Sequence, residues 1–459
     1  MGLHIIFLIL HVFVGTINDP VLVSIMLIVH SMTTIAVSAA AGRKINVISA
    51  FAAGVVIITL GNASFASKVV KHGVDSSSMY YYVSAPHLNE AALVWSVGCS
   101  FIFIGYEMFA KRSFPSLSII VDSPRALRNI FWVSIGLCML RLSGTFIDLN
   151  FISGGVQKLF ALSSIMSVLL FARLWGKQGT LLYRNYAMGI CAALATVALF
   201  QGFLRIDLAT PFIVFFGGYF IGLGSIRYLF SYRVIPMAVV VIAFSTVFGN
   251  LGANRSHFID TFTNPVEEVA PSYTISSTQN SDRNSLLIRG GNIAQISNVC
   301  KLVERNGHYN GEASAPLIFA FIPRVLWPEK PTIEIGAWFA LEIGVAAISA
   351  QTGRANNSIN MSIPGQFFLD FGWIGVALGC LFFGAVLAMF WNAAEFNGSP
   401  YNVMGVLWGG YLLFYAILGI GADLQIFITF CSTYLTIFIV KKIYTSLYAH
   451  SQRRPAMEG

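Results

Sequence analysis

Charge is scarce in this 459-residue chain: Asp, Glu, Lys and Arg make up 10% of it, whereas soluble domains carry about 25%. Hydrophobic residues make up 56% of the chain, which excludes an ordinary soluble protein. Apolar runs near spanning length recur, for example residues 21–41. Such runs must be helical in a bilayer, because backbone groups there find no water. The sequence therefore predicts an all-α, polytopic integral membrane protein.

Other signatures are missing too. Cysteine is limited to six residues, of which only Cys300 lies in a polar stretch, without an evident disulfide partner. No basic tract exceeds two residues, so the net charge of +8 does not indicate nucleic-acid binding. No P-loop, nucleophile elbow, zinc-peptidase helix, Cys/His metal cluster or DxD pattern is present. These absences predict no cofactor and no metal.

Apolar runs predict about twelve membrane helices. They are expected near residues 3–17, 21–41, 45–63, 90–110, 129–147, 153–172, 186–204, 209–226, 234–251, 371–392, 402–420 and 424–440. The first run lacks the basic start and the cleavage site of a signal peptide, so it is expected to span the membrane. Lys and Arg concentrate in alternate short loops, as at Arg43 and Lys44. This positive-inside pattern predicts that both termini are cytoplasmic.

This orientation divides the chain into three parts. Residues 1–251 form an N-terminal helix bundle, 252–370 a large periplasmic loop, and 371–459 the C-terminal helices with a cytoplasmic tail. Within the loop, residues 285–306 and 333–350 have the periodicity of short helices. We therefore expect the loop to be folded and docked on the membrane surface.

Arginine is enriched in this loop, and guanidinium groups bind phosphate oxygens bidentately. The alternative is a solvated loop whose arginines pair with nearby acids. The candidate substrate-binding residues are Arg255, Arg289, Arg305, Arg354 and Trp327. The eight histidines are scattered along the sequence, and only His257 and His308 share the loop with these arginines.

One stretch of the loop, FIPRVLWPEKP at residues 321–331, concentrates charge between three prolines. Proline restricts its own backbone and that of the preceding residue, so Arg324 and Lys330 are held on a stiff path. Trp327 is suited to anchoring at the membrane interface. The segment is a candidate site for a lipid-linked phosphate, or else an interfacial turn whose cations meet ordinary anionic headgroups.

Residues 316–340 and 358–388 together resemble the Wzy-type O-antigen or exopolysaccharide repeat-unit polymerases of bacterial inner membranes. The matching residues are Pro323, Arg324, Leu326, Trp327, Pro328, Lys330, Pro331, Ser362, Pro364, Gly365, Phe371, Gly372 and Gly375. Elsewhere the likeness is one of topology. The chain lacks the repeated arginine motif in two periplasmic loops described for some members, which argues against a two-loop catch-and-release scheme here.

The resemblance implies a GT-C-like glycosyltransferase that joins undecaprenyl-diphosphate-linked oligosaccharides. It implies that Arg324 and Lys330 neutralise the diphosphate leaving group. Glu334, Asp370 and His308 are then the candidate general bases for the acceptor hydroxyl. Membrane lipids are expected partners, and a chain-length regulator protein is a further candidate partner.

Three other functions remain open. An O-antigen ligase would use the same donor and a similar fold but transfer the chain to a lipid A core. A polysaccharide flippase or another transporter would place its cations along the midplane of the helix bundle. A non-catalytic scaffold of envelope assembly would need no cation cluster.

Overall fold

The structure is a computed structural model that describes most of the chain. The described ranges are 1–40, 46–72, 85–143, 154–200, 205–224, 292–317, 335–344, 358–418 and 424–453, with Trp327, Ala346, Ile348 and Ala355 as single residues. Within these ranges the secondary structure is helical and no β-strand forms. Seven of the described helices are long and apolar enough to cross a membrane. The prediction of an all-α, membrane-embedded protein is thus confirmed.

The helices follow the apolar runs closely. In the first half they are α1 (Gly2–Gly15), α2 (Pro20–Ala40), α3 (Val47–His72), α4 (Leu88–Phe109), α5 (Pro124–Ser143), α6 (Gly154–Gln178), α7 (Leu181–Phe200) and α8 (Arg205–Gly222). In the second half they are α13 (Ile293–Asn306), α14 (Ile335–Glu342), α15 (Ile363–Ala394), α16 (Val403–Leu418) and α17 (Gln425–Arg453). The helix expected at 234–251 lies outside the described residues.

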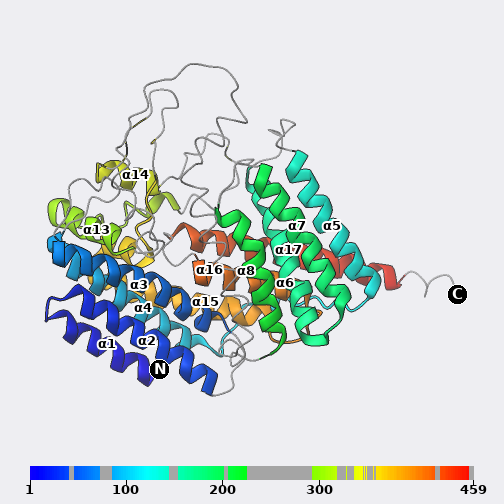
Figure 1. Cartoon of the computed structure of the whole chain (residues 1–459), viewed down its shortest axis with the longest axis horizontal. Helices are drawn as coiled ribbons and strands as arrows, with labels where there is room; N and C mark the ends of the chain where they lie inside the picture. Colours follow the sequence, from blue (N-terminus) through cyan, green and yellow to red (C-terminus); the bar gives the residue numbers. More distant parts are fainter. Residues whose placement is uncertain are drawn as a thin grey trace.

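Two groups of helices meet around α15 and α16 (Figure 1). Helices α1 to α4 form one group, and α5 to α8 form the other. Helix α15 packs along α4, and α16 contacts both α3 and α6, so these two C-terminal helices join the groups. Helices α13 and α14 lie together at one end of the first group.

Glycines allow the helix backbones to approach closely. A Cβ on Gly105 of α4 would collide with the carbonyl oxygen of Leu381, and one on Gly384 of α15 with that of Ile102. On α8, a Cβ on Gly222 would meet the carbonyl oxygen of Arg173 in α6. Small residues at a helix interface are the usual means of tight packing in membranes. Gly105, Gly222 and Gly384 therefore serve close helix contacts.

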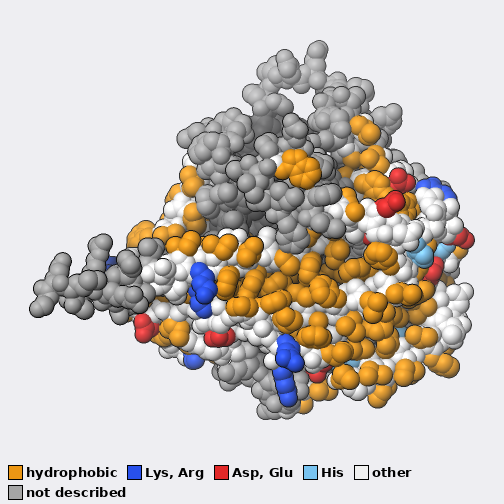
Figure 2. Space-filling model, turned by 180° about the vertical axis from the view of Figure 1, so that it is seen from behind, with side chains coloured by type: hydrophobic (Ala, Val, Ile, Leu, Met, Phe, Trp, Pro, Cys, Tyr) orange, Lys and Arg blue, Asp and Glu red, His pale blue; other side chains and the backbone are white. Residues whose placement is uncertain are grey.

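Hydrophobic side chains also cover much of the outside. Figure 2 shows a broad face on which they run almost unbroken, with few charges among them. Ile6, Ile9 and Phe13 of α1 are exposed, as are Ile374 and Leu378 of α15. Soluble monomers seldom expose such continuous apolar surface. This face is suited to contact with lipid chains.

The expectation of short helices in the loop is met by α13 and α14, which fall within the two periodic stretches. Helix α13 is amphipathic and buries Ile296, Val299 and Leu302. Its N-terminus is capped by Asn62 of α3, whose Oδ1 accepts from the backbone N–H groups of Asn292 (2.8 Å) and Ile293 (2.9 Å). Because Asn62 is itself buried, this cap fixes α13 to the helix bundle.

Candidate functional site

A break in α15 organises the candidate site. Gly372 has φ 61° and ψ −148°, a conformation outside the helical region that divides α15 into two helical pieces. The first piece begins at Ser362, whose side chain accepts a hydrogen bond from the N–H of Gly365 at 3.2 Å. Pro364 occupies its first turn, where a missing N–H costs nothing. Ser362, Pro364, Gly365 and Gly372 thus build a capped helix start and a break.

Residues after α13 form hydrogen bonds with the helix end at this break. Carbonyl groups at the end of a helix lack intrahelical partners. Here the N–H of Tyr309 donates to the carbonyl oxygen of Leu369 at 3.1 Å, and the N–H of Asn310 to that of Asp370 at 2.8 Å. The loop directly after α13 is therefore bonded to the C-terminal end of the first piece of α15.

His308 belongs to the same set of contacts. Its Nδ1 lies 3.1 Å from the carbonyl oxygen of Phe368, and its ring packs edge-on against the Phe368 ring. A carbonyl oxygen only accepts, so Nδ1 carries the hydrogen and Nε2 of the neutral ring keeps its lone pair. Nε2 faces Gly372, where an added Cβ would lie 2.8 Å from it. The residue is solvent-exposed, and in the neutral ring Nε2 is the nitrogen with the free lone pair that a general base uses.

Asp370, two residues after Phe368, is fully buried. Ser314 donates a short hydrogen bond to its Oδ2, and the N–H of Ala313 donates to its Oδ1 at 3.2 Å. Gln366 donates to Ser314 at 3.0 Å and accepts from the N–H of Leu424 at 2.8 Å. Both carboxylate oxygens are engaged, so this geometry favours a positioning role for Asp370 over direct contact with an acceptor.

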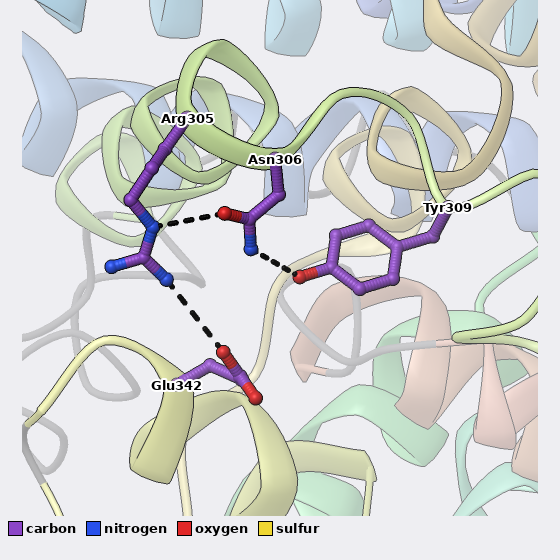
Figure 3. Close-up of polar contacts among 4 residues, drawn as sticks. All are labelled: Arg305, Asn306, Tyr309 and Glu342. Atoms are coloured by element: carbon purple, nitrogen blue, oxygen red, sulfur yellow. Dashed lines mark hydrogen bonds and ion pairs between the residues drawn. The ribbon is translucent and has the colours of Figure 1, made fainter.

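Arg305 lies at the end of α13 and is held by its neighbours (Figure 3). Its guanidinium is 3.7 Å from the carboxylate of Glu342 in α14, and its Nε donates to Asn306 at 3.0 Å. Asn306 in turn donates to the hydroxyl of Tyr309 at 3.0 Å. This is the arrangement expected for a loop arginine paired with a nearby acid, and it links α13 to α14.

The remaining candidate residues are placed less fully. Trp327 is half-buried. The following lie outside the described residues: Arg255, Arg289, Arg324, Lys330, Glu334 and Arg354. The structure thus brings His308 and Asp370 together at the break in α15 and places Arg305 three residues before His308, at the end of α13.

Sequence reasoning missed two features. One is Ser314, a partner of Asp370 across 56 residues that no local pattern indicates. The other is a buried cluster of His4, His11 and His30. The spacing of His4 and His11, two helical turns apart, places them on one face of α1 and was the available signal.

Within the described part of the chain, no group of three or more His, Cys, Asp or Glu side chains is arranged to hold a metal ion. Compared with models of protein families, with curated proteins and with solved structures, the chain matches none of them.

Proposed function

We propose that this protein is a membrane glycosyltransferase that polymerises undecaprenyl-diphosphate-linked oligosaccharide repeat units. Its place is the bacterial inner membrane, with both termini cytoplasmic, the 252–370 loop in the periplasm and a GT-C-like arrangement of about twelve spans. The observation that carries the proposal is the exposed His308 imidazole. Its tautomer is fixed by the Phe368 carbonyl, at a helix break built from the polymerase-like motif.

His308 is the proposed general base. The hydroxyl at the non-reducing end of the acceptor loses its proton to Nε2 as its oxygen attacks the anomeric carbon of the donor. The new carbon–oxygen bond forms while the bond to the diphosphate breaks, and the lipid diphosphate leaves with the electron pair. A positioned base of this kind contributes about 10²–10⁴-fold to rate.

The leaving diphosphate gathers negative charge, which nearby cations stabilise. Arg324 and Lys330 are the proposed partners, because the prolines of 321–331 limit their backbone freedom and the tryptophan between them favours the interface. The donor carries its own leaving group, so a nucleotide sugar is not required for this step.

A polysaccharide gel tests the proposal. A strain deleted for the gene is complemented with wild type, His308→Gln, Arg324→Ala or the control Arg305→Ala, all at equal protein levels. A polymerase predicts surface glycan of a single repeat in the deletion strain. Wild type and Arg305→Ala should restore the ladder, and the other two variants should not.

The other outcomes separate the alternatives. Loss of all glycan from the lipid A core, with lipid-linked polymer accumulating on the outer leaflet, would indicate a ligase. Single lipid-linked repeats trapped on the cytoplasmic leaflet would indicate a transporter. A normal ladder in the deletion strain would end the proposal.

A further inference from the structure

Three histidines meet inside the first helix group, at the interface of α1, α2 and α4. His4 and His11 come from α1 and His30 from α2, and their exposed fractions are 4%, 0% and 0%. Ionisable side chains inside membrane helices are rare and usually mark a functional path. This cluster lies in helices that do not carry the candidate glycosyltransfer site.

The three rings form a hydrogen-bonded chain. His4 Nδ1 is 2.9 Å from His30 Nε2, and the other nitrogen of the same ring, His30 Nδ1, is 3.4 Å from His11 Nε2. Phe7 stacks on His30 at a centroid distance of 4.4 Å, and Phe103 stacks on His4 at 5.3 Å. The central imidazole thus uses both nitrogens on two other imidazoles, within aromatic walls.

Within the described part of the molecule, no carbonyl or carboxylate is hydrogen-bonded to any of the three rings. A buried histidine with a structural role commonly gives one nitrogen to a carbonyl or carboxylate, which sets where its hydrogen resides. In the chain each contact joins two nitrogens, either of which can donate or accept. Ser100 approaches His30 Nδ1 at 3.5 Å, but its hydroxyl hydrogen goes to the Ser96 carbonyl at 2.9 Å. Its oxygen is left as a weak acceptor.

The two ends of the hydrogen-bonded row of histidines have different surroundings. Glu107 lies one turn beyond Phe103 on α4, on the side of His4, and it also faces the amino group of Met1 at 3.6 Å. At the other end, His11 Nδ1 is buried and has no hydrogen-bond partner among the described residues, and the same holds for the buried hydroxyls of Ser31 and Ser96. Helix α2 has no acidic or basic residue, and Asp19 and Glu90 lie at the opposite ends of the helices from Glu107.

We propose that His4, His30 and His11 form a proton relay within the membrane, connecting the Glu107 end of α4 with the interior of the helix group. A hydronium ion that enters the helix group gives its proton to His11 Nδ1 and becomes water, and His11 passes its Nε2 hydrogen to His30 Nδ1. His30 passes its Nε2 hydrogen to His4 Nδ1, and His4 releases its Nε2 hydrogen toward Glu107. One N–H bond forms and one breaks at each ring, and all three tautomers reverse.

The relay is tested with ¹⁵N-ring-labelled histidine in the full chain, reconstituted in lipid nanodiscs and observed by NMR. No ligand is added, and the buffer contains EDTA so that protons, not metal ions, occupy the imidazole nitrogens. For His4, His11 and His30 we expect each nitrogen signal to be averaged between its protonated and unprotonated positions. His87 and His308, which face a carboxylate at 3.1 Å and a carbonyl at 3.1 Å, should show two distinct nitrogens and serve as internal controls.

Two variants separate a relay from a merely structural cluster. Gln at position 30 can donate and accept but cannot exchange a hydrogen between two nitrogens, so His30→Gln should abolish averaging at His4 and His11 while the protein stays folded. His87→Gln should leave the averaging unchanged. Fixed tautomers in the wild type, or averaging that survives His30→Gln, would overturn the proposal. Signals that shift stoichiometrically with added Zn²⁺ would make the cluster a metal site and overturn it as well.

Discussion

His308 and His30 have the same side chain but opposite surroundings. His308 is exposed, and its Nδ1 faces the Phe368 carbonyl, which leaves one defined lone pair on Nε2. His30 is fully buried, and both of its nitrogens face other imidazoles. The comparison shows that the partner atom determines what each imidazole can do. A carbonyl partner fixes the tautomer of His308 and leaves one nitrogen free to accept a proton. Imidazole partners allow His30 both to accept and to donate a hydrogen.

The two sites also differ in the contacts that hold their histidines in place. The break in α15 is assembled from segments about 60 residues apart, through backbone hydrogen bonds at residues 308–310. The histidine chain is assembled only by helix packing, with stacked phenylalanines around it. We therefore expect the first site to depend on backbone geometry and the second on side-chain identity.

Among variants that leave both histidine sites chemically intact, the largest effect should come from Gly372→Ala, which disturbs His308 and not His30. An L-residue at this φ and ψ costs about 1–3 kcal/mol, and the new Cβ would displace His308 Nε2. Displacement of a positioned base by about 1 Å lowers rate by roughly 100-fold. The measurement is the proposed activity itself, the amount of polymer that the purified protein forms per minute.

The matched control is Gly136→Ala in α5, where an added Cβ meets no atom within 4 Å. It should polymerise like wild type. In the NMR experiment, Gly372→Ala should leave the averaged signals of His30 in place. Full polymerase activity in Gly372→Ala would contradict the assigned role of the break.

A smaller effect is expected from Asn62→Ala, which removes the cap that docks α13 beside His308. Loss of such a cap costs about 1–2 kcal/mol. Burial, together with the nearby Glu90, raises the pKa of the Cys300 thiol above its ordinary range, which disfavours the reactive thiolate. Maleimide labelling of Cys300 should be slow in wild type and faster by roughly 5–30-fold in Asn62→Ala, because α13 undocks more often.

Asn392→Ala is the control for this experiment. Asn392 donates to the carbonyl oxygens of Ala110 and Arg112, at the end of α15 away from the break. Its replacement should leave Cys300 labelling slow. If Asn62→Ala also leaves labelling unchanged, the docking of α13 does not depend on this cap.

The smallest effect should come from Arg305→Ala. The pair with Glu342 is exposed, and such pairs contribute at most about 1 kcal/mol. Arg305→Ala, Glu342→Ala and the double variant should therefore have similar thermal stability and similar polymer yield. A loss of polymer in Arg305→Ala without a loss in Glu342→Ala would instead make Arg305 a substrate ligand.

Much of the helix layout could be predicted, because apolar length is what a bilayer selects. The predicted helix boundaries were less accurate. Helix α17 runs to Arg453, beyond the expected residue 440, because a helix can continue into polar residues outside the hydrocarbon. Helix α15 starts at Ile363, where the sequence predicted 371. The Phe371–Gly372 pair marks a break within this helix, with helical residues on both sides.

The site was predictable only in part. The loop composition and the motif placed His308 and Asp370 among the candidates, but hydrogen bonds between residues 308–310 and 368–370 leave no local pattern in the sequence. The histidine chain was missed because its central member comes from a different helix from the other two. A periodic pattern describes one helix face and carries no information on which face lies opposite.

The measurement that tests the central claim most directly uses purified protein in proteoliposomes with lipid-diphosphate-linked repeat units. Initial rates of chain extension are compared for wild type, His308→Gln and His30→Gln. The account predicts that His308→Gln is slower by about 10²–10⁴-fold while still binding the substrate, and that His30→Gln retains a rate near wild type. A wild-type rate in His308→Gln, or no extension by the wild-type protein, would contradict the account.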